Sequence, residues 1–246
     1  MIILDKDAVS PDKHGCSPQD RNIEQLLESC FILLDKSPGP SSHQVSAWAR
    51  DMMGLEKLGH GGTLDPFADG VLIIGVGKGT KLLTDIVNEK KSYNATLLLG
   101  KETDSLDNEG EIVKRKSVPK LNEDLVIKIL NSFLGRYIQK PPMFSAKKVN
   151  GVRLYKLARK KIEVERDDQN CTIYDISLRG IESNVIEFAV TCSKGTYIRV
   201  LGSDIAKKIG TVGYLTKLTR TSIGKHSLSK SLTIKNFESK WKSTEN

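Results

Sequence analysis

The sequence predicts an α+β fold built on a mixed, largely antiparallel sheet that helices flank. Short apolar runs typical of strands recur along the chain, and helical patterns interrupt them without the regular alternation of a doubly wound fold. In addition, Asn150-Gly151 lies between two strand-like segments and is a strong β-hairpin signal. No internal repeat is present.

The first elements follow from hydrophobic pattern and turn residues. Residues 1–28 are polar and broken by Pro and Gly, so we expect a flexible extension with about one helical turn near 23–27. The run CFILLDK is a buried strand, and SPGPS then forces a turn after which Ser42 can cap a helix that Gly54 ends. The run VLIIGV is another buried strand, and a short helix follows it from about Thr80.

The later elements are predicted in the same way. Alternating apolar residues in YNATLLLG place Tyr93 and Leu99 on one face of a strand. Asn122 can cap a helix that carries Leu125 and Ile129 and closes at Gly135. The remaining expected elements are strands at CTIYDISL and VIEFAVTC, a helix from about Val200 to Ile209, and a final short helix marked by Ile234, Phe237 and Trp241.

The charge of the chain points to a polyanionic partner. The formal net charge is +8, and it is unevenly distributed. Gly135–Ile162 holds nine basic residues and no acid, and Lys194–Lys225 holds seven basic residues and one acid, whereas Glu102–Glu111 holds five acids. Two separate basic blocks favour a nucleic-acid surface over a merely solvated face.

The cysteines and apolar runs exclude several classes of protein. The four cysteines are scattered without a CxxC pair, so we expect no zinc site and a reducing compartment. The chain carries charge too early for a signal peptide, and no apolar run approaches the roughly 20 residues of a membrane span. We therefore expect a soluble, cytoplasmic protein that does not bind membranes.

The stretch GHGGTLDPFADGVLIIGVGKGT offers two candidate chemistries. The first is a phosphate cradle at GVGKGT, but a Walker A loop needs a glycine where this chain has Leu72. We interpret these glycines as a turn from a strand into a helix. The second is Asp65, which precedes Pro66 and is therefore presented from extended backbone among flexible glycines. Taken alone, Asp65 could equally form an Asx turn or a helix cap.

Six ordered blocks give Asp65 a context. They are ILLDKSPGPSSH, GHGGTLDP, KSYNA, QKPPMFSAKKVNGVRLYKLAR, CSKGTYIR and GYLTKLTRTSIG. Together they resemble the TruB family of pseudouridine synthases, which modify uridine 55 of tRNA, from Phe31 to about Phe237. The resemblance implies the pseudouridine synthase fold and a catalytic domain over residues 29–246 after the extension 1–28.

The resemblance also implies the site. Asp65 corresponds to the essential aspartate, Tyr93 to the residue that packs against the target base, Arg199 to the partner of the aspartate, and His60 to a residue that helps displace the base. Further substrate-binding residues are expected at Lys36, Gly62, Thr63, Lys147, Arg153, Tyr197, Leu215 and Arg220.

A single carboxylate is enough for the isomerisation of uridine to pseudouridine that the resemblance implies. Breaking the bond from N1 to C1′, rotating the uracil and rejoining it through C5 needs one carboxylate, as nucleophile or as base, and no metal or cofactor. A glycosidase would need two carboxylates, and Asp69 is the nearest second one. We interpret Asp69 as a surface residue or a cap. Arg199 would keep Asp65 ionised by charge pairing.

RNA binding is expected mainly through phosphates. The resemblance implies an RNA-binding insertion at about residues 117–161 that closes over the T arm of tRNA. Longer relatives carry a PUA domain, for which this chain leaves no room, so we expect a short form that binds as a monomer through its catalytic domain alone. Gly61 and Thr219 depart from the common family residues, and Thr219 puts one contact in doubt.

Two alternatives stay open. One is a guide-dependent synthase of the rRNA type, whose segments around Asp65 are similar but which depends on a PUA domain and protein partners. The other is a non-catalytic tRNA-binding or folding factor on the same scaffold. The acidic stretch KETDSLDNEGEIV argues against the first, and an intact set of Asp65, Tyr93 and Arg199 argues against the second.

Overall fold

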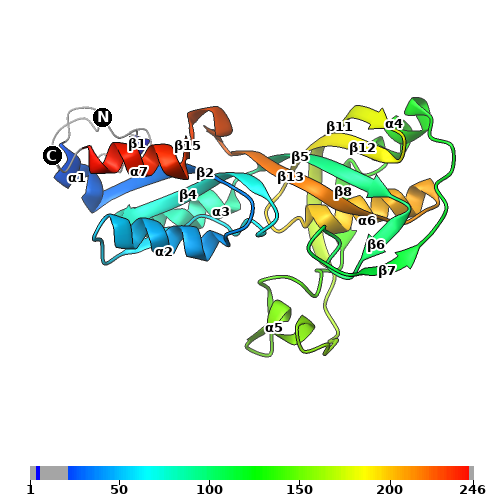
Figure 1. Cartoon of the computed structure of the whole chain (residues 1–246), viewed down its shortest axis with the longest axis horizontal. Helices are drawn as coiled ribbons and strands as arrows, with labels where there is room; N and C mark the ends of the chain where they lie inside the picture. The colour runs from blue at the N-terminus through cyan, green and yellow to red at the C-terminus, as the bar shows by residue number, and fades with distance from the viewer. Residues whose placement is uncertain (1–3, 6–21, 244–246) are drawn as a thin grey trace. The chain divides into compact units, whose positions relative to one another are not determined.

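The structure is a computed structural model that describes residues 4–5 and 22–243 (Figure 1). Most of the expected extension, residues 1–28, lies outside the described part of the chain. The described residues form two compact units. Unit 1 holds the described residues up to Glu89 and from Thr219 onward, and unit 2 holds Lys90–Leu218. The sequence pattern over residues 29–246 did not indicate this division.

Unit 1 is a small sheet with helices on both faces. Its strands are ordered β1-β2-β4-β13, where β2 pairs antiparallel with β4 and the last residues of β13 pair parallel with β4. Its elements are β1 (Leu4–Asp5), α1 (Ile23–Glu28), β2 (Ser29–Lys36), α2 (Ser42–Met52), β3 (Leu58–His60), β4 (Asp69–Gly77), η3 (Lys78–Leu82), α3 (Leu83–Asn88), β13 (Gly213–Ile223, shared with unit 2), β14 (His226–Ser227), η4 (Leu228–Lys230), β15 (Leu232–Thr233) and α7 (Ile234–Lys242).

Alternation along β2 and β4 divides the core of unit 1 between two faces. Ile32 and Leu34 point to the face where α1, α2 and α7 pack, and Phe237 of α7 is fully buried there. Phe31 and Leu33 point to the opposite face, which α3 covers with Leu83 and Ile86. Because both faces are covered, β2 and β4 read as unbroken apolar runs.

The glycines of GVGKGT serve packing. Gly77 has φ 55°, and a Cβ there would lie 2.3 Å from the carbonyl oxygen of Glu28. A Cβ on Gly79 would lie 2.6 Å from the carbonyl oxygen of Cys30. The chain passes this closely because it must turn from β4 into η3 against the start of β2. These contacts agree with the interpretation as a glycine turn.

Unit 2 holds most of the antiparallel sheet, in the order β13-β5-β12-β11-β8. Helix α6 packs on β5, and α4 packs on α6 and β11. The elements are β5 (Lys91–Leu99), β6 (Lys101–Thr103), β7 (Ile112–Arg115), α4 (Glu123–Asn131), β8 (Gly135–Gln139), β9 (Lys148–Val149), β10 (Val152–Arg153), α5 (Leu154–Ala158), β11 (Gln169–Glu182), β12 (Val185–Cys192), α6 (Ile198–Ile209) and the first residues of β13. With parallel and antiparallel pairs and flanking helices, the predicted α+β class is confirmed.

Most predicted elements are present, with shifts at particular residues. The predicted cap Ser42 is wrong, because Ser41 is the N-cap of α2 and Ser42 lies inside the helix. Leu125 is 44% exposed and Val126 is buried instead, so the buried face of α4 lies one residue further along. The hairpin at Asn150-Gly151 is confirmed: both residues have positive φ and join β9 to β10.

The predicted insertion at about residues 117–161 does not stand apart as a whole. Helix α4 packs on the sheet of unit 2, and β8 pairs with β11 within that sheet. The segment that forms separate small elements is therefore shorter: it begins after Gln139 and contains the two-stranded sheet of β9 and β10 and the helix α5. Its role in binding RNA stays a prediction.

Candidate functional site

Asp65 begins a turn between β3 and β4 of unit 1. Its carbonyl oxygen accepts a hydrogen bond from the N–H of Ala68 at 3.1 Å, so the turn is closed through the backbone. The side chain is half-buried, flanked by the buried Leu64 and the half-buried Pro66. Before it, Gly62 has φ 94°, a conformation that favours glycine. The carboxylate is thus presented from a tight loop that a backbone hydrogen bond closes.

Lys36 and Ser42 hold this loop on either side of Asp65. Lys36 is the last residue of β2, and Ser42 is the first residue of α2. The hydroxyl of Ser42 accepts from the N–H of Leu64 at 2.8 Å and donates to its carbonyl oxygen at 2.9 Å. The ammonium of Lys36 donates to the carbonyl oxygen of Pro66 at 3.1 Å. Lys36 is 0% exposed. Its ammonium therefore positions the loop, and its predicted contact with substrate stays a prediction.

Arg220 of β13 braces the other end of the loop. Its guanidinium donates to the carbonyl oxygens of Val71 at 2.8 Å, Thr63 at 3.3 Å and Gly62 at 3.2 Å. The side chain is 1% exposed, so it too is directed into the protein. Arg220 therefore shapes the backbone that carries Asp65, and its predicted contact with substrate stays a prediction. Thr63 itself is exposed, and its predicted role stays open.

We expect Arg220→Met to lower the free energy of unfolding by about 3 kcal/mol or more, because it leaves buried carbonyl oxygens without a donor. Urea denaturation of the full chain measures this change. Arg50→Met is the matched control, since Arg50 pairs with Asp51 at the surface and such pairs contribute at most about 1 kcal/mol. Equal losses for both variants would contradict the bracing role.

His60 and Asp69 flank the loop with polar groups that are partly withdrawn from solvent. Burial, followed by the positive charges of His43 and Arg220, holds the pKa of His60 below its usual 6.5, so the imidazole is neutral at pH 7. Asp69 is half-buried at the start of β4, and its Oδ1 has no hydrogen-bond partner among the described residues. Asp69 is thus only partly exposed, and its interpretation as a surface residue or a cap stays a prediction. Burial and the nearby Asp69 charge raise the pKa of Asp35.

Arg199 lies in unit 2, on the first turn of α6, and is 3% exposed. Its guanidinium lies 3.1 Å from Oδ2 of Asp107 and donates to the carbonyl oxygens of Ser105 and Phe144, both at 2.7 Å. Asp107, 4% exposed, was not among the predicted site residues. The sequence offers one signal for Asp107: it is one of the five acids of Glu102–Glu111, and this stretch by itself indicates only an acidic block.

Asp107 is held as firmly as Arg199. Its Oδ1 accepts from the hydroxyl of Ser105 and from the N–H of Glu109, so both oxygens are engaged. Ser105 is itself buried. A buried carboxylate with this many donors is typical of a group kept in its charged form to orient a cation.

The remaining predicted residues of unit 2 occupy different environments. Tyr93 lies on β5, is 7% exposed, and pairs across the sheet with Val190. Tyr197 is the N-cap of α6, and its N–H donates to the buried Gln139 at 2.6 Å. Leu215 is 0% exposed and packs in the core of the unit, so its predicted contact with substrate is replaced by a structural one.

The basic segment around the hairpin is largely solvated. Arg153 is exposed and donates to the carbonyl oxygen of Ala146 at 2.6 Å, and Lys147 is half-buried. Both stay predicted phosphate contacts. Asp65, His60 and Arg220 belong to unit 1, whereas Tyr93, Arg199 and the basic segment belong to unit 2.

The described residues contain neither a membrane-spanning helix nor a cluster of metal-binding side chains. In residues 22–243, no helix is long and apolar enough to cross a bilayer. Across the same residues, no group of three or more His, Cys, Asp or Glu side chains could hold a metal ion.

Comparison with known proteins points in one direction. Residues 50–198 match the model of the TruB family pseudouridylate synthase N-terminal domain, and residues 1–46 match the DKCLD (NUC011) domain. Proteins named tRNA pseudouridine synthase B are similar over most of the chain. The one from Syntrophotalea carbinolica is 42% identical, covering 85% of this chain and 68% of that protein, and the one from Clostridium tetani is 46% identical, covering 74% and 63%.

The solved structures that are similar include a Cbf5-Nop10-Gar1 complex, with TM-score 0.75 and 28% identity over 99% of this chain and 65% of that chain. The Nop10-Cbf5 complex of the archaeal box H/ACA sRNP gives TM-score 0.73 and 26% identity over 99% of this chain and 64% of the other. The chain spans between 58% and 69% of the length of the curated relatives it matches.

Proposed function

Because this chain belongs to the TruB family of pseudouridine synthases, we propose that it isomerises uridine 55 in the T loop of tRNA to pseudouridine. Family membership rests on the matched N-terminal domain and on relatives that are 40–46% identical along most of the chain. Those relatives are named tRNA pseudouridine synthase B, and the predicted family and enzyme class are thereby confirmed. The position of the uridine and the residues that act on it are the proposal.

The observation that supports the proposal most strongly is the bracing of Asp65. Three side chains from separate segments, Lys36, Ser42 and Arg220, bind backbone groups around it, while none of these contacts uses its carboxylate. A loop built in this way presents a carboxylate in one orientation at little cost in conformational entropy. Such preorganisation is typical of a catalytic group.

The reaction must begin by extruding the uridine from its loop, because the glycosidic bond is unreachable while the base is stacked. Unstacking costs a few kcal/mol. We propose that His60, which is neutral and sits at the end of β3, takes part in displacing the base, and that the face of Tyr93 packs against the uracil ring. Contacts to phosphates from the basic segment with Lys147 and Arg153 then offset the cost of extrusion.

Asp65 then acts on the ribose. As an ionised carboxylate it either attacks C1′ or removes a proton at C2′, and the bond from N1 to C1′ breaks. The detached uracil rotates and its C5 forms the bond to C1′, as Asp65 leaves C1′ in the first route or as C2′ regains its proton from Asp65 in the second; the proton on C5 is then lost and N1 gains one. Substrate and product are isomers, so no oxidant or reductant enters the balance. Arg199 of unit 2 is proposed to take part in the same reaction, with Asp107 holding its guanidinium in place.

The test is pseudouridine mapping in an unmodified tRNA transcript after incubation with the purified chain alone. We expect conversion at uridine 55 and at no other uridine of the T arm. A transcript that carries cytidine at this position is the matched control and should gain no pseudouridine. Conversion elsewhere in the transcript would refute the assignment of the position, and no conversion at all would leave a binding-only protein or a guide-dependent enzyme.

A second candidate function is a guide-dependent synthase, which the DKCLD match and the likeness to Cbf5 favour. The solved neighbours are described as complexes with Nop10 and Gar1, and one as an H/ACA RNP bound to a substrate RNA. Their identity to this chain is 26–28%, well below that of the tRNA enzymes. The same assay separates the two, since a guide-dependent enzyme would leave the transcript unmodified without a guide RNA and partners.

A further inference from the structure

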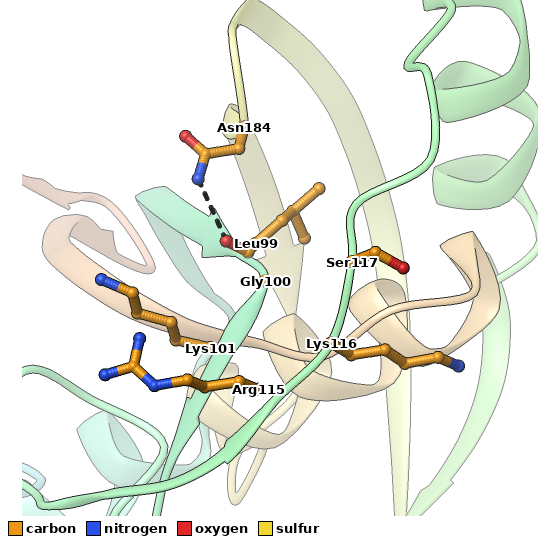
Figure 2. Close-up of a pocket in the computed structure, with 7 residues that line it drawn as sticks. All are labelled: Leu99, Gly100, Lys101, Arg115, Lys116, Ser117 and Asn184. Atoms are coloured by element: carbon orange, nitrogen blue, oxygen red, sulfur yellow. Dashed lines mark hydrogen bonds between the residues drawn. The ribbon is translucent and has the colours of Figure 1, made fainter.

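A basic hollow lies in unit 2, apart from every residue predicted to bind substrate (Figure 2). Its volume is about 310 Å³, and it is lined by the junction of β5 and β6, the end of β7 and the turn between β11 and β12. Three cations, Lys101, Arg115 and Lys116, line it together with Ser117 and Asn184, and no acid does. We define these five residues as the basic hollow.

Within the described residues, no acid pairs with the charges of the basic hollow. Lys101 and Arg115 lie directly opposite each other on the antiparallel strands β6 and β7, and Figure 2 shows their charged groups extending side by side. Like charges in this position destabilise a strand pair. In residues 22–243, neither these two nor Lys116 forms an ion pair with an acid.

The nearest acid in the sequence does not relieve this repulsion. Glu102 follows Lys101 on β6, so its side chain points to the opposite face of the strand, where it accepts a hydrogen bond from the hydroxyl of Ser203 at 3.4 Å. The register places Lys114, not Arg115, across from Glu102. Within residues 22–243, no acidic partner relieves the repulsion between Lys101 and Arg115, so an anion bound from outside the chain would lower it.

We propose that the basic hollow binds the phosphate backbone of the tRNA substrate, as a second contact besides the basic segment around the β9–β10 hairpin. This inference rests on the proposed function. Lys116 points away from the other two cations in Figure 2, so the three do not converge on one small ion. They suit successive phosphates of one strand, with Lys101 and Arg115 on one phosphate and Lys116 on the next. The exposed β7 leaves room for such a strand.

The test compares two variants of the full chain that each lose two positive charges. Lys101→Gln/Arg115→Gln removes the paired cations of the basic hollow, and Lys114→Gln/Lys128→Gln removes two exposed cations of the same unit that lie outside it. Affinity for an unmodified tRNA transcript is measured by filter binding over a series of salt concentrations. For the first variant, we expect the dissociation constant to rise roughly tenfold and the slope of log affinity against log salt to fall by about 2 in magnitude. The control should change the slope by less than about half a unit.

A second readout locates the contact directly. Acetylation of lysines in the wild-type chain, followed by mass spectrometry, should show that tRNA protects Lys101 and Lys116 and leaves Lys128 reactive. Inorganic phosphate alone should protect neither. Equal protection by phosphate would mean that the ligand is a small anion, and equal salt slopes for the two double variants would exclude an RNA contact here; either result overturns the proposal.

These outcomes are separate from a failure of the proposed function. Pseudouridine is measured in the same wild-type samples. If uridine is converted but Lys101→Gln/Arg115→Gln does not change the affinity for tRNA, the basic hollow has no role in binding tRNA. The proposed enzymatic function is then unaffected. If the affinity for tRNA depends on the basic hollow but no uridine is converted, the binding role of the hollow is supported and the enzymatic function is rejected.

Discussion

Asp65→Asn is expected to lower the rate of pseudouridine formation by roughly 10³-fold or more, because the amide can neither attack C1′ nor remove a proton. The substitution preserves shape, and the loop is held through the backbone of Leu64, Pro66 and Ala68. The variant should therefore fold and bind tRNA as the wild type does. Single-turnover conversion of a transcript, followed by chemical mapping, measures the rate.

Asp69→Asn is the matched control for this experiment. Asp69 belongs to the same motif and is also half-buried. Its negative charge repels that of Asp35, so neutralising Asp69 relieves this repulsion instead of removing a catalytic group. We expect its rate to stay within about tenfold of the wild type. Equal rates for wild type and Asp65→Asn would remove Asp65 from the mechanism, and a loss confined to Asp69→Asn would move the catalytic role to Asp69.

The second large effect is expected in the buried pair of unit 2. Arg199→Met leaves the Asp107 carboxylate charged and buried without its cation, and removing one partner of such a pair costs roughly 3–5 kcal/mol. Asp107→Asn weakens the same interaction from the other side. Urea denaturation of each variant gives the change in the free energy of unfolding, and the double variant should lose less than the sum of the two.

Lys207→Met provides the comparison for this pair. Lys207 lies on the same helix and pairs with Asp204 at the surface, where an ion pair contributes about 1 kcal/mol or less. The hypothesis that Asp107 orients Arg199 fails if Arg199→Met costs no more than Lys207→Met. If stability falls as expected but the rate of conversion by the folded Asp107→Asn variant is unchanged, the pair is structural and has no part in catalysis.

Local sequence determined many of the elements, because their signals act over a few residues. Alternation from Tyr93 to Leu99 makes β5, Asn122 caps α4, Gly210 ends α6 in the left-handed conformation, and Asn150-Gly151 joins β9 to β10. Each of these depends on the φ/ψ preference or hydrogen bonding of the residue itself. The six ordered blocks also identified the family and placed Asp65 in it.

Only the tertiary structure decided what the buried charged residues do. The sequence indicates Lys36 and Arg220 only as substrate-binding residues, yet both bind carbonyl oxygens of the Asp65 loop from other segments of unit 1. Asp107 looked like one acid in an acidic block, yet it holds Arg199. The physical reason is that the partners of a side chain depend on which distant segments the fold brings together. Burial decides whether a charged residue has a structural role, and burial is not encoded in the residue's neighbours along the sequence.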